Sequence, residues 1–127
     1  MYISKIQTYD AEDREADVFV SDGINTLLCY VYPAKKINPG MDIRLLSCFG
    51  CSDILAQGTD TVCTQMKRSD IGFYAYTIVA QIVSMKENTV KTGEFYMQLD
   101  SCFPGDCKMG DIVSFNVTRI DVVTNDR

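Results

Sequence analysis

Apolar and polar residues alternate with a period of two along much of the chain, and this period predicts strands. The clearest case is 94–100, in which every second residue is apolar. Segment 74–85 carries apolar residues on both parities, as expected for a strand inside a sheet. The polar residues 86–89 connect these two segments. We therefore predict one long hairpin from Tyr74 to Asp100, whose outgoing arm is a central strand with both faces covered.

Turn signals divide the rest of the chain into further strands. Asp22-Gly23 and Pro39-Gly40 are strong reversal signals. In the last predicted strand, the apolar positions change parity after Val117. A β-bulge near Thr118-Arg119 would return the later residues to the core. Besides the hairpin, we expect an edge strand at 2–9 and strands at 16–21, 27–32, 41–45, 61–66 and 113–122.

The segment Ser52–Gln57 is where we expect a helix, because Ser52 can cap it and Gly58 can end it. A short helix after the third core strand is typical of a small closed antiparallel barrel of the oligonucleotide/oligosaccharide-binding type, here over Ala16–Val122. An antiparallel β-sandwich is the alternative. The length of 127 residues and the 46% hydrophobic content predict a single β-rich domain, residues 1–127.

Charge narrows the set of partners. The chain has 17 acidic and 12 basic residues and a net charge of -5, and its basic residues form no cluster larger than the isolated pairs Lys35-Lys36 and Lys67-Arg68. Proteins that follow a nucleic-acid backbone need clustered Lys and Arg, so nucleic acid is a disfavoured partner. The first residues lack the apolar run of a secretory signal, and no stretch approaches the roughly 18 apolar residues of a membrane span. We expect a cytoplasmic protein that does not bind membranes.

The densest run of charge follows the first predicted strand, where a turn is expected. One interpretation is a solvated hairpin tip. The other is a patch that steers a basic partner, because clustered like charge raises the rate of encounter with an opposite surface. The run lacks the glycine and the terminal glutamate of a calcium-binding loop. As candidate partner-binding residues it supplies Asp10, Glu12, Asp13, Glu15 and Asp17.

Tyrosines on the predicted strands form a second candidate set. Such side chains can fill a sheet and leave their hydroxyls at its rim, or they can anchor a protein interface. On a barrel face they could also stack nucleic-acid bases, although the acidic balance of the chain disfavours that use. The candidates are Tyr30, Tyr32, Tyr74, Tyr76 and Tyr96.

The cysteines are the third candidate set. Cys48 and Cys51 form a CxxC motif, and Cys102 and Cys107 form a looser pair, so four thiolates could close a zinc site. The spacing of the second pair is atypical, and nothing in the sequence brings the two pairs together. A thioredoxin-like role requires a helix that begins at the motif, and the β-rich surroundings disfavour it. We expect reduced thiols, no metal and no cofactor.

The chain contains no histidine, which removes the commonest general base and the commonest metal ligand. No carboxylate pair or phosphate-binding glycine loop indicates another reaction centre. We therefore expect a non-enzymatic domain that holds a basic partner protein through charge and tyrosine. Immunity proteins, which neutralise cationic toxins, share this profile by analogy of class. The alternative is a module that binds nucleic acid or oligosaccharide through the strand tyrosines.

Overall fold

A computed structural model describes residues 1–34, 36–58, 65–68 and 74–124. They form eleven strands joined in one mixed sheet, and no helix occurs among them. The spatial order is β1-β2-β3-β11-β4-β9-β8-β7-β10-β5, with β6 paired to β7. The strands are β1 (Tyr2–Asp10), β2 (Glu15–Ser21), β3 (Thr26–Val31), β4 (Leu46–Phe49), β5 (Ser52–Gly58), β6 (Gln65–Arg68), β7 (Tyr76–Ser84), β8 (Thr89–Thr92), β9 (Phe95–Leu99), β10 (Ile112–Val117) and β11 (Arg119–Val122).

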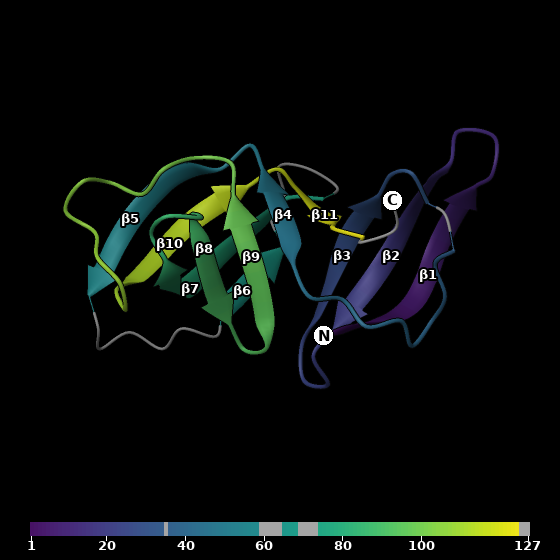
Figure 1. Ribbon diagram of the computed structural model, residues 1–127, viewed down its shortest axis with the longest axis horizontal. Helices are drawn as coiled ribbons and strands as arrows, with labels where there is room; N and C mark the ends of the chain where they lie inside the picture. Colours follow the sequence, from purple (N-terminus) through teal and green to yellow (C-terminus); the bar gives the residue numbers. More distant parts are fainter. Residues whose placement is uncertain (35, 59–64, 69–73, 125–127) are drawn as a thin grey trace.

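The molecule is elongated, with β1, β2 and β3 side by side at one end and β5 at the other (Figure 1). These ends of the strand order do not pair with each other, so the sheet stays open. The all-β prediction is confirmed, but the closed antiparallel barrel is wrong. Two pairs, β3 with β11 and β4 with β9, run parallel. The protein therefore has an open or sandwich-like β-fold. None of the described elements is a helix that could cross a membrane.

The predicted helix at Ser52–Gln57 is wrong, because these residues belong to β5. The strand runs antiparallel to β10, with Ala56 opposite Val113 and Leu55 opposite Ser114. A segment of six residues is too short to be a stable helix by itself. Since β10 offers an edge of backbone donors and acceptors, pairing with it overrides the local capping signal.

The predicted central strand is β7. It pairs with β10 along one edge and with β6 and β8 along the other. Its buried face carries Ile78, Ala80 and Ile82, whereas the opposite face is exposed or half-buried. The prediction of two covered faces is therefore wrong. The long hairpin is wrong in its returning arm. The strand that folds back onto β7 is β8, and the chain reverses again at Gly93, which has a φ of 56°, so that β9 pairs with β8 and β4 instead of β7.

The predicted change of parity in the last strand is confirmed at Thr118. Before it, β10 pairs with β7 and β5; after it, β11 pairs with β4 and β3. The N–H and the Oγ1 of Thr118 both donate to the Phe49 carbonyl oxygen, at 3.0 and 2.9 Å. The break keeps the apolar residues of both strands in the core: Val113, Phe115, Val117, Ile120 and Val122.

One core extends along the sheet from β1–β3 to β10. Its buried side chains come from β1–β3 as well as from β4 and β7–β11. A buried polar contact links β7 to β3: the Leu28 N–H donates to the Tyr76 Oη at 2.8 Å. Tyr76 is only 6% exposed. Its hydroxyl therefore satisfies a buried backbone donor of a strand that is remote in the sequence.

Replacing Tyr76 by Phe removes this acceptor and leaves the Leu28 N–H buried without it. We expect Tyr76→Phe to lower the free energy of unfolding by about 1–3 kcal/mol. Urea denaturation followed by circular dichroism measures the change. The matched control is Tyr96→Phe on β9, where the ring is 38% exposed, and we expect a loss below about 0.5 kcal/mol there. Equal losses in the two variants would contradict the role assigned to the Tyr76 hydroxyl.

Gly50, between β4 and β5, allows a second test of the Thr118 contact. It has a φ of 67°, and a Cβ at this position would lie 2.2 Å from Thr118 Oγ1. Gly40 has a φ of 88° with nothing within 4 Å of such a Cβ. Backbone strain affects both positions, but close packing affects only Gly50. We expect Gly50→Ala to cost about 3 kcal/mol and Gly40→Ala about 1 kcal/mol in thermal unfolding. A smaller loss in Gly50→Ala than in Gly40→Ala would overturn this explanation.

Candidate partner-binding site

The acidic run forms the turn between β1 and β2. Asp10 ends β1 and lies opposite Glu15, which begins β2. The Oδ1 of Asp10 accepts hydrogen bonds from the backbone N–H groups of Glu12 and Asp13, at 3.0 and 3.1 Å. A short acidic side chain commonly closes a turn in this way. The turn itself is therefore shaped by one of its own carboxylates.

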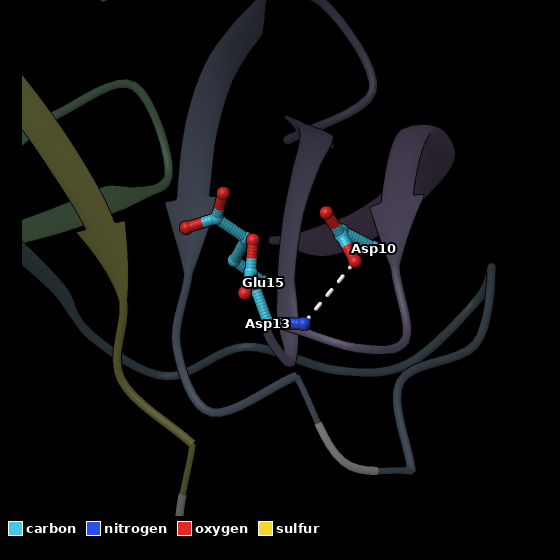
Figure 2. Close-up of side chains that lie close together, drawn as sticks. All are labelled: Asp10, Asp13 and Glu15. Atoms are coloured by element: carbon cyan, nitrogen blue, oxygen red, sulfur yellow. Dashed lines mark hydrogen bonds between the residues drawn. The ribbon is translucent and has the colours of Figure 1, made fainter.

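Three carboxylates crowd together at this turn. Figure 2 shows Asp10 on β1, Asp13 in the turn and Glu15 on β2, and one carboxylate oxygen from each lies within 4.8 Å of the others. The charge of Asp10 is the largest cause that raises the pKa of Asp13; slight desolvation and the charge of Glu15 add to it. Exposed acidic groups commonly lie this close, so the cluster alone assigns no metal. A positive group brought to the turn would relieve the repulsion.

Beside the turn, four residues lie in line across four strands. Thr8, Asp17, Tyr30 and Asp121 are successive cross-strand partners on β1, β2, β3 and β11. The Thr8 Oγ1 donates to the Oδ2 of Asp17 at 2.8 Å, and the hydroxyl of Tyr74 donates to the Oδ1 at 2.6 Å. Asp17 therefore fixes Tyr74, which lies just before β7, against the hairpin.

Tyr30 is held from three sides. Its hydroxyl donates to the Glu15 Oε2 at 2.7 Å. Its ring meets the Tyr74 ring edge to face, with centroids 6.2 Å apart and an interplanar angle of 71°. The Arg119 guanidinium lies 4.8 Å from the Tyr30 ring centroid and forms two hydrogen bonds with Asp121, at 2.6 and 2.9 Å. Both aromatic rings are thus fixed in orientation.

These contacts change the acidity of both tyrosines. The hydrogen bond to Glu15, followed by burial, raises the pKa of Tyr30 to about 12. Burial, followed by the hydrogen bond to Asp17, raises the pKa of Tyr74 to about 12. The negative carboxylates favour the protonated donors. Both hydroxyls therefore remain protonated at neutral pH.

These residues surround a pocket of about 250 Å³. Three carboxylates and three tyrosines line this small volume, and no Lys or Arg is among the described lining residues. Carboxylates bind cations by charge and hydrogen bonding, and aromatic rings by cation–π attraction. The pocket suits a Lys or Arg side chain from another molecule. Its lining is Thr8, Tyr9, Asp10, Glu15, Ala16, Asp17, Tyr30 and Tyr74.

The remaining sequence candidates lie outside this pocket. Glu12 and Asp13 are exposed in the turn beside it. Tyr32 is 64% exposed just after β3, and Tyr96 lies on β9 with the Lys91 Nζ 5.3 Å from its ring centroid. Tyr76 lies in the core, so we exclude it from the candidate partner-binding surface. The five tyrosines do not share one face.

Sequence reasoning missed Thr8, Tyr9 and Arg119. The register of the β1–β2 hairpin places Thr8 opposite Asp17, and a correct estimate of the turn length would have found it. Arg119 had no such signal, because its contact with Tyr30 depends on β11 meeting β3, which are distant in the sequence.

The described cysteines, which are Cys29, Cys48, Cys51, Cys102 and Cys107, are free thiols. Cys63 lies outside the described residues. The acidic trio at the β1–β2 turn is the one group of three or more potential metal-binding side chains among the described residues. The two cysteine pairs therefore do not converge on a zinc site in this part of the chain.

Comparison with models of protein families, with curated proteins and with solved structures finds no match. The chemistry of the site is therefore the basis for assigning a function.

The raised tyrosine pKa values can be measured by following tyrosinate absorbance against pH. We expect Tyr30 and Tyr74 to ionise near pH 12, above the roughly 10 of unperturbed tyrosines. In Glu15→Gln, the pKa of Tyr30 should fall while that of Tyr74 stays raised, because Tyr74 bonds to Asp17. Tyr30→Phe and Tyr74→Phe assign the transitions.

The same shifts have a consequence for stability at high pH. Since the folded pKa of each tyrosine exceeds the unfolded one, their contribution to stability is fully present below about pH 10 and is lost as the pH rises through about 12. Ionisation of both residues near pH 10 would contradict the hydrogen bonds described here.

Proposed function

We propose that this protein is a non-enzymatic binding domain whose acidic pocket receives a Lys or Arg side chain of a basic partner protein. The observation that carries the proposal is the meeting of Glu15 and Asp17 with Tyr30 and Tyr74 around one pocket. Carboxylates alone are common on surfaces. Carboxylates that also orient two aromatic rings form a site with shape as well as charge.

Charge supports the first stage of binding, which is the encounter. The chain has a net charge of -5, and the exposed turn concentrates negative charge beside the pocket. Such a patch accelerates association with a positive surface, and salt weakens the effect because it screens the charges. The repulsion that raises the pKa of Asp13 is also relieved when a positive group arrives.

Rigid aromatic groups support the second stage, which is anchoring. Tyrosines that are already held in place lose little conformational entropy on binding, and tyrosine is enriched among the residues that contribute most to protein interfaces. Glu15 holds Tyr30, and Asp17 holds Tyr74. Arg119 is satisfied by Asp121, so it does not compete for the pocket carboxylates.

Within this class we favour an inhibitor of the immunity type, acting in the cytoplasm, which covers the functional surface of a cationic protein. Charge complementarity would bring the two proteins together, and occlusion would neutralise the partner. Two features that would support binding of nucleic acid are not found in the described residues. The sheet is not a closed barrel, and the candidate tyrosines do not share one face.

The test compares two variants with equal charge but different placement. Glu12→Lys/Asp13→Lys reverses charge at the turn, whereas Glu87→Lys/Asp106→Lys reverses it at other exposed positions. Each replacement changes the charge by two, so both variants go from -5 to -1. Immobilised wild-type protein and both variants are exposed to lysate from the source cells. We expect a basic protein to bind to the wild type and the control variant and to be lost from the turn variant.

The captured protein then defines the kinetic test. We expect its association rate to fall by about tenfold between low and high salt, since screening removes the steering. Retention by the turn variant, or a rate that is indifferent to ionic strength, would overturn the proposal. Binding of single-stranded oligonucleotides at low salt with an affinity equal in both variants would favour the nucleic-acid function instead.

A further inference from the structure

The CxxC motif forms the turn between β4 and β5. Cys48 lies in β4, and Cys51 directly precedes β5, so the two flank Phe49-Gly50. The Cys51 Sγ donates to the Cys48 carbonyl oxygen at 3.6 Å, which shows that the Cys51 side chain folds back over the turn. The neighbouring Cys51 thiol, followed by burial, raises the pKa of Cys48 well above its ordinary value. The two thiols are therefore neighbours in the folded chain.

The backbone of the turn is fixed from two sides. The Asp100 carboxylate accepts the Gly50 N–H at 2.8 Å and the Cys51 N–H at 3.2 Å. On the other side, Thr118 binds the Phe49 carbonyl oxygen through two hydrogen bonds. The fold therefore maintains the proximity of the thiols, whereas a free peptide of the same sequence would sample many other conformations.

The two cysteines differ in access. Cys48 is 1% exposed, whereas Cys51 is half-buried. A reagent in solution therefore meets Cys51 first, and Cys48 is positioned to react with whatever Cys51 has bound. This asymmetry between an entry thiol and a resolving thiol is typical of reversible dithiols.

We propose that Cys48 and Cys51 are a redox modification site, which is converted to an intramolecular disulfide by exchange with a low-molecular-weight disulfide such as glutathione disulfide. The Cys51 thiol loses its proton, and its thiolate attacks one sulfur of glutathione disulfide. This forms a mixed disulfide and releases one glutathione thiolate. The Cys48 thiol then passes its proton to the released glutathione thiolate and attacks the Cys51 sulfur. This forms the Cys48–Cys51 bond and displaces the second glutathione as a thiolate, which takes up the proton that Cys51 lost. Two electrons and two protons pass from the protein to two glutathione molecules.

This site differs from the thioredoxin arrangement, because the motif lies at the bend between two strands and no helix begins at it. It is also independent of the proposed binding function, although the two regions touch. The Phe49 ring in the turn lies 5.3 Å from the Arg119 guanidinium, which covers Tyr30. Oxidation would therefore take place next to the outer wall of the acidic pocket.

The test uses the native folded chain in glutathione buffers of increasing oxidised fraction. After acid quenching, free thiols are alkylated, and the chain is cut on the amino side of aspartate. Cleavage before Asp42 and Asp53 releases 42–52, which contains Cys48 and Cys51 and no other cysteine. We expect this peptide to be unalkylated and lighter by two hydrogen atoms. We also expect an equilibrium constant at least about tenfold larger than that of a synthetic 42–52 peptide.

Two variants separate this site from the other thiols. Cys102→Ser removes an exposed cysteine and should leave the equilibrium unchanged, whereas Cys51→Ser should leave Cys48 open to alkylation after unfolding. An equilibrium constant no larger than that of the synthetic peptide would overturn the proposal. So would a stable glutathione adduct on Cys51 without a disulfide to Cys48.

Discussion

Thr118 is the residue at which the two halves of the sheet are joined. The chain leaves β10, which pairs with β7 and β5, and enters β11, which pairs with β4 and β3. One irregular residue changes the parity, so that apolar side chains on both sides stay in the core. The two hydrogen bonds from Thr118 to Phe49 hold the β4–β5 turn against this break. The CxxC turn and the position of Arg119 both depend on this junction.

The candidate binding site also depends on this junction, because β11, which follows Thr118, pairs with β3. The pairing of Asp121 with Tyr30 completes a row across β1, β2, β3 and β11. Within that row, Asp17 accepts hydrogen bonds from two side chains that are far apart in the sequence, Thr8 and Tyr74. The pairing of β1, β2 and β3 supplies the carboxylates and Tyr30, and a contact that is remote in the sequence supplies Tyr74. Neither alone would form the pocket.

The sequence predicted features that depend on local pattern. The alternation at 94–100 and the parity change near Thr118 were visible because period-two patterning reports directly on which side chains are buried. The segment Ser52–Gln57 was assigned wrongly, because its capping signal is local and its pairing with β10 is not. The acidic run was readable, but its contact with Tyr74 was not, since that contact requires the path of the whole sheet. The burial of Tyr76 was not readable either, because its contact with Leu28 also joins strands that are distant in the sequence.

The most direct measurement of the central claim is hydrogen exchange of the protein with and without its captured basic partner. If the acidic pocket is the binding site, protection should rise in 8–17 and in β3, while β5 and β10 at the far end of the sheet exchange as before. Protection confined to β5 and β10, with no change in the hairpin of β1 and β2, would contradict the account.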